Sequence, residues 1–285
     1  MEHSKEMFRL ESKFGWTSPL PNSDGVRMPN NSNHSPISFP EDSWDDKAVN
    51  DEGVGVWGEI RLREVHSLML KHGLSTIWEV GAGNGAVCLG LSALGHEVIA
   101  VEPLYGGAKY IAEKGLTSFG STLNELKLPS NSIPSIGVFD VLEHIEQTGP
   151  MLHEFARVLR KDGLLLISVP AHEFLFSKHD SSIGHFRRYS KSKLRNSLDS
   201  AGFELVSCTF LFSFLVPVAW LLRVLPEKLG LGQKADSISK GRTQLRIANA
   251  LSPVFRLGVA VEKLFRFPFG LSLFAVARPK NNSLP

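Results

Sequence analysis

The sequence between Thr76 and Pro103 constrains what this chain can fold into more than any other part of it. An apolar run over 76–80 predicts a buried strand, and it is followed by glycines at alternate positions, Gly81, Gly83 and Gly85. Glycine allows a sharp turn after a strand and leaves room for a ligand beside the backbone and the N-terminus of the next helix. That helix is expected over 86–94, and a second buried strand over 98–101. This order of elements predicts a nucleoside-binding unit.

Two carboxylates stand at defined positions around the glycines. Glu102 lies 21 residues after Gly81, where the first crossover unit of a Rossmann-like sheet places a carboxylate against ribose hydroxyls. Glu79 lies two residues before Gly81, where a carboxylate attracts a ligand's ammonium group and repels a pyrophosphate. Gly81, Gly83 and Ala86 also fit the looser pattern of dinucleotide-binding folds, so a nicotinamide-dependent oxidoreductase stays open as an alternative.

The composition is that of an ordinary globular protein, with 42% hydrophobic and 21% charged residues among 285. The formal net charge of +2 argues against nucleic acid being bound over the whole surface, and no nucleic-acid partner is expected. Cys88 and Cys208 are the only cysteines, which excludes a disulfide framework and a zinc cluster, and we predict no metal site. The first residues lack the apolar core of a secretory signal, so a cytoplasmic location is expected.

The chain divides into three parts. Residues 1–50 are rich in Ser, Asn, Pro and Asp, which predicts a flexible or loosely packed N-terminal arm. Strand and helix patterns alternate over 51–210, and a last strand pattern covers 271–277. We therefore predict an α/β domain with a doubly wound sheet, formed by residues 51–210 plus 271–280, and an insertion formed by residues 211–270.

The remaining elements follow from apolar spacing and from stop residues. Helices are expected over 56–72, 106–114, 151–159 with Gly163 as its stop, and 190–201 with Ser190 as its N-cap. Strands are expected over 116–119, 133–140, 164–169 and 203–210. The stretch 180–190 is expected to be a loop, and it is dense in functional groups.

The insertion is both apolar and basic. It carries nine Lys and Arg against three acidic residues, and the run 205–222 has no charged residue. We do not interpret this run as a transmembrane helix, because its first part is needed as a strand and Pro217 interrupts the rest. Apolar side chains beside cations suit peripheral membrane contact, a pocket for a lipid tail or a dimer face. A helical cap over an ordinary hydrophobic substrate fits equally well, and the oligomeric state stays open.

Taken together, these motifs resemble the class I S-adenosylmethionine-dependent methyltransferases. The glycine stretch Glu-x-Gly-x-Gly-x-Gly is similar to their first motif. Four further stretches resemble one branch of this family. They are Phe-Asp-Val-Leu-Glu-His-Ile at 139–145, Ser-Val-Pro-Ala at 168–171, Gly-His-Phe-Arg-Arg-Tyr at 184–189 and Pro-Phe-Gly-Leu-Ser-Leu at 268–273. The resemblance implies S-adenosyl-L-methionine as cofactor and a Rossmann-like sheet of seven strands whose last strand pairs antiparallel with strand six. Relatives often begin strand four with Phe-Asp, whereas this chain has Ile133-Pro134.

The resemblance also implies a set of site residues. The residues expected to bind the cofactor are Arg61, Glu79, Gly81, Ala82, Gly83, Gly85, Glu102, Pro103, Thr122, Leu123, Phe139 and Asp140. Of these, Arg61 is expected near the ligand's carboxylate, and Thr122 and Leu123 near the adenine. Arg187, Arg188 and Tyr189 are expected to bind the acceptor, although either arginine could instead pair with Asp140, Glu143 or Asp180 to fix the loop.

An acceptor must lose a proton when it is methylated. Histidine is the side chain best suited to accept a proton near neutral pH, and His144 and His185 follow strands four and five at the ligand-binding edge of such a sheet. A structural hydrogen bond is an open alternative for both. We expect in-line methyl transfer to a small-molecule or lipid-linked acceptor. A cofactor-binding scaffold without catalysis, which docks on a membrane or partner through 211–270, is the alternative from another class.

Overall fold

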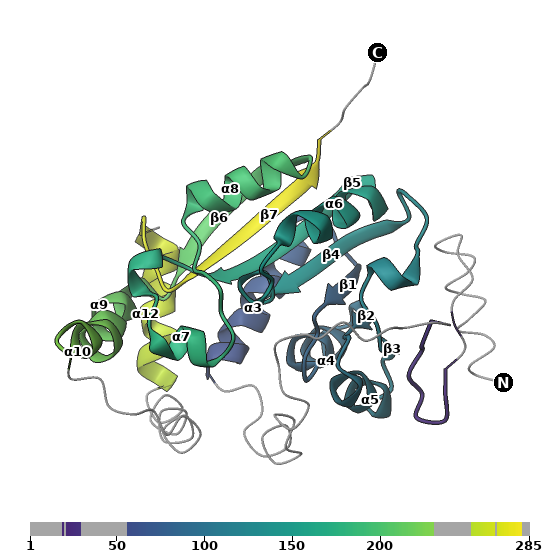
Figure 1. Ribbon diagram of the computed structural model, residues 1–285, viewed down its shortest axis with the longest axis horizontal. Helices are drawn as coiled ribbons and strands as arrows, with labels where there is room; N and C mark the ends of the chain where they lie inside the picture. Colours follow the sequence, from purple (N-terminus) through teal and green to yellow (C-terminus); the bar gives the residue numbers. More distant parts are fainter. Residues whose placement is uncertain (1–18, 20, 30–55, 231–251, 266, 281–285) are drawn as a thin grey trace.

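The computed structural model describes residues 19, 21–29, 56–230, 252–265 and 267–280. Its centre is a seven-stranded sheet in the order β3-β2-β1-β4-β5-β7-β6, with β7 antiparallel to both of its neighbours and the remaining pairs parallel (Figure 1). The strands are β1 (Thr76–Val80), β2 (Glu97–Val101), β3 (Thr117–Phe119), β4 (Ile133–Phe139), β5 (Leu159–Pro170), β6 (Phe203–Leu211) and β7 (Ser272–Pro279). The predicted fold class, with an antiparallel last strand, is confirmed.

Helices cover both faces of the sheet because successive side chains of a buried strand point in opposite directions. On β1, Trp78 and Val80 belong to the core shared with α6 (Thr148–Val158) and α8 (Lys191–Ser200). Ile77 belongs to the opposite core, which includes residues of α3 (Val56–Lys71), α4 (Ala86–Ala93), α5 (Tyr105–Glu113) and α12 (Ser252–Phe265). The buried runs that the sequence assigned to strands therefore form the middle layer.

Several local predictions are confirmed and one is wrong. Ser190 caps α8, since its hydroxyl accepts a hydrogen bond from the amide of Lys193 at 3.1 Å. Gly163, in contrast, does not end the helix before it, because α6 stops at Val158 and β5 already begins at Leu159. The β4–β5 register shifts between Ile133 and Ser135, and a Cβ on Gly163 would lie 3.0 Å from the carbonyl oxygen of Pro134. Gly163 thus permits a bulge beside a proline that has no amide to donate.

The chain between β6 and β7 is helical where the structure describes it. After β6 come η5 (Ser213–Leu215), α9 (Val216–Ala219), the π-helical turn η6 (Trp220–Val224) and α10 (Leu225–Lys228), and α12 precedes β7. The buried carboxylate of Glu262 on α12 accepts hydrogen bonds from the amides of Phe212 and Phe214, which joins the two ends of the insertion. Helices α9, α10 and α12 gather at one end of the molecule (Figure 1). Among the helices that the structure describes, none has the length and apolar character needed to cross a bilayer.

Part of the predicted N-terminal arm extends the sheet. Residues 21–29 lie beside β3, where the amide of Arg27 donates to the carbonyl of Ser118 at 2.9 Å and the amide of Gly120 donates to the carbonyl of Arg27 at 3.0 Å. Val26 and Arg27 are buried. A Cβ on Gly120 would stand 2.5 Å from the sulfur of Met28, so the glycine lets this segment pack closely. Residues 21–29 are therefore packed against the domain, and the rest of the predicted arm lies outside the described residues.

We predict that this packing contributes to the stability of the domain. Val26→Ala removes buried methyl groups and is expected to lower the free energy of unfolding by about 1–3 kcal/mol in urea denaturation. Val206→Ala, at a valine that is 43% exposed, is the matched control and is expected to change it by less than about 0.5 kcal/mol. Equal losses in the two variants would show that residues 21–29 unfold independently of the sheet.

Candidate functional site

The site lies where the order of the strands reverses. Strands β1 and β4 are neighbours, although β2 and β3 intervene in the chain, and such a reversal is where doubly wound sheets bind ligands. Strand β1 leads into Gly81 and β4 leads into Asp140, and both residues have positive φ, 75° and 54°. Gly83 and Gly85 also have positive φ, and a Cβ on Gly81 would stand 2.5 Å from Val141. The turn that the glycines predicted is therefore required by backbone angles and by close packing.

Glu102 faces the glycine turn, as its spacing predicted. One carboxylate oxygen accepts the amide of Gly83 at 2.7 Å and the other accepts the amide of Leu104 at 2.8 Å. Burial raises the pKa of Glu102 to about 7, against these two hydrogen bonds, which lower it. Each carboxylate oxygen keeps a second acceptor position, so the group can also receive two hydroxyls.

Glu79 is buried beside the thiol of Cys88 on α4. The Cys88 sulfur donates to the Glu79 carboxylate at 2.8 Å, and the sequence did not predict this partner. Burial raises the pKa of Glu79 to about 7, while the Cys88 hydrogen bond and the charge of Arg61 lower it and the charge of Glu102 raises it. The charges of Arg61 and Glu102 therefore both act on the Glu79 carboxylate near the end of β1.

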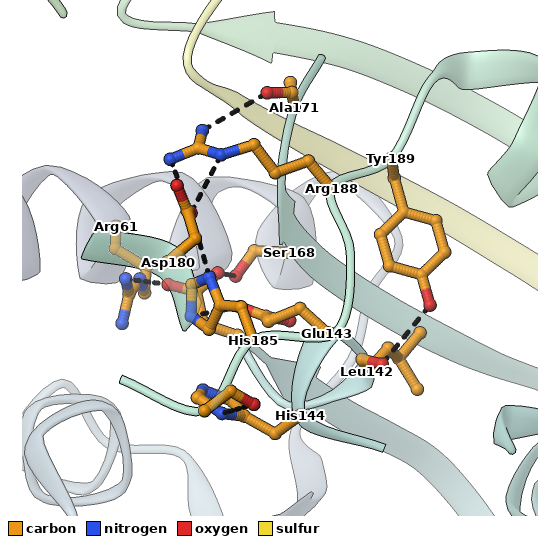
Figure 2. Close-up of polar contacts among 12 residues, drawn as sticks. Arg61, Leu142, Glu143, His144, Ser168, Ala171, Asp180, His185, Arg188 and Tyr189 are labelled. Carbon is orange, nitrogen blue, oxygen red and sulfur yellow. Dashed lines mark hydrogen bonds and ion pairs between the residues drawn. The ribbon is translucent and has the colours of Figure 1, made fainter. Parts of the chain in front are cut away.

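Arg61 and Asp140, both predicted to bind the cofactor, form an ion pair with each other (Figure 2). Asp140 also accepts a hydrogen bond from the hydroxyl of Ser168 at 2.9 Å. The predicted contact of Arg61 with a ligand's carboxylate stays a prediction, and in this structure it would require the ligand to share Arg61 with Asp140 or to displace Asp140. The side chains remain 34% and 29% exposed, so the pair is open to solvent on one side.

The other residues predicted to bind the cofactor lie mostly inside the domain. Leu123 and Phe139 belong to the two cores, and Ala82 is also buried. Thr122 is engaged locally, since its amide and its hydroxyl both donate to Glu125, at 2.8 Å and 3.0 Å. Pro103 is half-buried directly after Glu102. The adenine contact expected of Thr122 and Leu123 stays a prediction.

On the acceptor side, Asp180 organises the stretch after β5. The expected loop begins as a short helix, α7 (Lys178–Ser182), and Asp180 is buried within it. Its carboxylate contacts Nδ1 of His185 at 3.1 Å and accepts Nε of Arg188 at 2.9 Å. Arg188 also donates to the carbonyl of Ala171. The acceptor contact predicted for Arg188 is thus replaced by the ion pair with Asp180, which was the open alternative.

Tyr189 and Arg187 are placed differently from each other. Tyr189 is 1% exposed, its hydroxyl donates to the carbonyl of Leu142, and burial raises its pKa to about 12. A contact between Tyr189 and the acceptor therefore does not fit this structure, because the ring belongs to the core. Arg187 is half-buried and donates to the carbonyl of Glu146, so its acceptor contact stays a prediction.

His144 and His185 lie together, from two different segments (Figure 2). Their ring centroids are 4.6 Å apart in an edge-to-face arrangement, and Nδ1 of His144 contacts the carbonyl of Gly184 at 3.3 Å. Burial, together with the charge of His185, lowers the pKa of His144 to about 4. His144 is therefore neutral at physiological pH and holds a lone pair.

Glu143 is the residue of the site that sequence reasoning missed. It is 0% exposed, and neither of its carboxylate oxygens has a hydrogen-bond partner among the described residues. Burial, and then the charge of Asp140, raise its pKa well above the ordinary value. Its oxygen lies 3.9 Å from Nε2 of His185. Its place beside His144 in the sequence was a signal, but burial without a partner cannot be read from a sequence.

A cavity of about 420 Å³ lies between the segment leading to α7 and the insertion. It is lined by Glu173, Phe174, Phe176, Val224, Glu227 and Lys228. The amide of Lys178, at the start of α7, donates to Glu227 of α10 at 2.9 Å. The cavity wall is thus connected to the element that carries Asp180.

Comparisons with known proteins agree with this geometry. Residues 60–208 match the family described as methyltransferase domain. The chain is 29% identical over 140 residues to a probable S-adenosylmethionine-dependent methyltransferase of Mycobacterium tuberculosis, a match that covers 48% of this chain and 51% of that protein. It is 31% identical over 112 residues to a ubiquinone biosynthesis O-methyltransferase of Bradyrhizobium sp., with coverage of 37% and 44%. The chain thus spans about half the length of the curated relatives it matches.

Among solved structures, the chain is similar to a putative sarcosine dimethylglycine methyltransferase from Galdieria sulphuraria. The TM-score is 0.57 at 15% sequence identity, and the match covers 85% of this chain and 98% of that one. At this identity the likeness shows the fold alone.

We predict that the buried Glu79 carboxylate costs stability above neutral pH. Its folded pKa of about 7 lies above the ordinary 4.5, so the charged form is disfavoured in the folded state and the stability present at low pH is lost as the pH rises through about 7. Glu79→Gln is therefore expected to raise the free energy of unfolding by about 2 kcal/mol near about pH 8 and to leave it unchanged near about pH 4.5. Urea denaturation at both values measures this, with Glu113→Gln at an exposed carboxylate as control. An equal effect at both values would contradict the raised pKa.

Proposed function

The chain belongs to the methyltransferase domain family, and we propose that it transfers a methyl group from S-adenosyl-L-methionine to a small-molecule or lipid-linked acceptor. The observation that carries this proposal is the Glu102 carboxylate, which is buried at the end of β2 and turned toward the amide of Gly83. A buried carboxylate with free acceptor positions beside a glycine turn suits the two hydroxyls of a ribose.

The residues around the glycine turn also fit the rest of this cofactor. Glu79 adds a second buried carboxylate, and a ligand's ammonium group would offset the cost of ionising it. Positive φ at Gly81, Gly83 and Gly85 keeps the backbone in a conformation that side chains with a Cβ rarely adopt. When bound, S-adenosylmethionine supplies an electrophilic methyl group on a sulfonium. The protein's task is then to orient the two reactants and to exclude water.

The acceptor side supports methyl transfer to an acceptor that carries an apolar part. Phe174, Phe176 and Val224 line the cavity beside α7, and they suit an aromatic or alkyl group. His144 and His185 lie edge to face, and Asp180 contacts the His185 ring, which would suit the pair to receive the proton that the acceptor loses. The acceptor would therefore lie between the cavity and the two histidines.

Two alternatives remain outside this proposal. A nicotinamide-dependent oxidoreductase would place a pyrophosphate near the glycine turn, beside the buried carboxylates of Glu79 and Glu102, where two further negative charges are unfavourable. A scaffold would bind the cofactor without turnover. The cavity and the paired histidines support a catalyst, because a scaffold needs neither.

We also propose that the insertion makes peripheral contact with membranes. Several of its large apolar side chains are exposed, among them Leu221, Leu222, Leu229, Leu257, Leu264 and Phe265. Such exposed side chains beside a basic sequence suit the surface of an anionic bilayer.

The cofactor site predicts micromolar binding of S-adenosylhomocysteine by calorimetry. Glu102→Ala removes the carboxylate that accepts the ribose hydroxyls and is expected to weaken binding at least about tenfold. Gly83→Val forces a side chain into positive φ, at a cost on the order of 1–3 kcal/mol, and is expected to weaken binding as well. Glu113→Ala, at an exposed carboxylate on α5, is the control and should bind as the wild type does.

Two further measurements separate the alternatives. S-adenosylhomocysteine is expected to raise the melting temperature and NADH is not, whereas the oxidoreductase alternative requires the reverse. Transfer of label from methyl-labelled S-adenosylmethionine to a fraction of extracted small molecules or lipids separates an enzyme from a scaffold. Cofactor binding without transfer to any fraction would favour the scaffold.

Membrane contact predicts sedimentation with vesicles of anionic lipid that weakens as salt is raised. Leu222→Glu combined with Leu264→Glu places charges on the exposed apolar surface of the insertion and is expected to abolish sedimentation. Leu70→Glu, at a leucine of α3 that is 63% exposed, is the matched control. Equal sedimentation of both variants would exclude the insertion as the contact surface.

A further inference from the structure

The carboxylate of Glu143 is fully buried, and neither of its oxygens has a hydrogen-bond partner in the part of the chain that the structure describes. A fully buried carboxylate normally has hydrogen-bond partners, because removing it from water without them is unfavourable. Both oxygens of Glu143 lack such a partner among the described residues, although the backbone around it is well held. Its own carbonyl accepts the amide of Phe186 at 2.8 Å. The side chain is therefore fixed in place with its acceptor positions unused.

His144 and His185 stand next to this carboxylate. One ligand atom of Glu143 and one ring nitrogen of each histidine all lie within 4.8 Å of one another. Ligands about 2.1 Å from one ion stand about 3–3.5 Å apart, so the three side chains need to close by at most about 1.3–1.8 Å. The three groups come from two segments, the turn after β4 and the stretch after α7 (Figure 2).

The neighbours of each imidazole favour metal binding at the opposite nitrogen. Nδ1 of His185 lies 3.1 Å from the Asp180 carboxylate, which accepts a proton carried on that nitrogen and so leaves the lone pair on Nε2. Nδ1 of His144 contacts the carbonyl of Gly184, which favours the same tautomer. A carboxylate or carbonyl behind each ring is the arrangement that orients histidine ligands in metalloproteins.

We propose that Glu143, His144 and His185 bind a divalent transition-metal ion at the opening for the acceptor. Two imidazoles and one carboxylate suit Zn²⁺, Fe²⁺, Co²⁺ or Mn²⁺ better than Ca²⁺ or Mg²⁺, which prefer oxygen ligands alone. The ion supplies the partner that the Glu143 oxygens lack.

Three protein ligands leave coordination positions for a further molecule. In a role that rests on the proposed methyl transfer, such a position would take a hydroxyl oxygen of the acceptor, and the ion would lower the pKa of that hydroxyl. The proton would leave to water, and the oxygen would bond to the methyl carbon as the carbon–sulfur bond of the sulfonium breaks and S-adenosylhomocysteine leaves. His144 and His185 then act on the acceptor through the ion and do not take its proton directly. This favours an acceptor that is methylated on oxygen.

Titration of the metal-free full chain with Co²⁺ tests the site, because the visible spectrum of Co²⁺ reports bound nitrogen ligands. We expect binding of about one Co²⁺ per chain, and Glu143→Gln is expected to weaken it at least about tenfold, since loss of one ligand exceeds the effect of losing an outer-shell partner. His66→Asn is the matched control, because His66 and His96 form another histidine pair, with ring nitrogens 2.9 Å apart. The control should bind Co²⁺ as the wild type does.

Folding of each variant is checked by its melting curve, and the wild type gives a second measurement that needs no substitution. Co²⁺ bound to two histidines shifts the ring N–H proton resonances of both, so two shifted exchangeable signals are expected. Absence of stoichiometric binding, full binding by Glu143→Gln or loss of binding in His66→Asn would overturn the metal site. Because S-adenosylhomocysteine binding is measured separately, its failure would contradict the proposed function and leave a positive Co²⁺ result standing.

Discussion

The carboxylate of Asp180 is the interaction on which the acceptor side of the molecule depends. It accepts the amide and hydroxyl of Ser177, which caps α7, and it binds Arg188 and His185. Burial alone would raise its pKa, but the hydrogen bond from His185 and the charge of Arg188 hold the pKa of Asp180 well below its usual range. One buried anion therefore fixes the start of α7, the guanidinium of Arg188 and the ring of His185. Loss of Arg188 would leave the charge of Asp180 uncompensated.

The cofactor side follows the opposite principle, because its carboxylates are buried with incomplete compensation. Glu79 and Glu102 both have pKa values raised to about 7 by burial, and the charge of Glu102 adds to the shift of Glu79. Arg61 opposes this charge but is itself paired with Asp140. A ligand that brings an ammonium group and hydroxyl donors would offset the cost of burying these carboxylates, so the burial that lowers stability would favour such a ligand. Asp180 is therefore a compensated structural anion, whereas Glu79 and Glu102 are buried with less compensation.

The sheet, the glycine turn and Glu102 could be predicted from the sequence because local patterns determine them: apolar runs, positive φ and fixed spacing in one crossover unit. The residues whose predicted roles differ from the structure are placed by tertiary contacts, which local patterns do not show. Gly163 resembles a helix stop but serves a bulge against Pro134, and residues 21–29 lack apolar periodicity but gain a strand partner in β3. Arg188 and Tyr189 sit in a polar motif, yet both side chains are buried. For Glu143, the lack of a hydrogen-bond partner among the residues that the structure describes is a property of the folded interior, and no local sequence pattern indicates it.

The two halves of the acceptor opening are joined to each other and to the insertion. The amide of Phe186 donates to the carbonyl of Glu143, so the turn after β4 and the stretch after α7 are held in one register. At the start of α7, the amide of Lys178 donates a hydrogen bond to the carboxylate of Glu227 on α10. The glycine turn is held by other partners, since the amide of Gly83 donates to Glu102 after β2 and a Cβ on Gly85 would stand 2.6 Å from Ile111 of α5. The insertion thus contacts both sides of the molecule, because α10 binds the start of α7 while α12 packs in the same core as α3, the helix that carries Arg61.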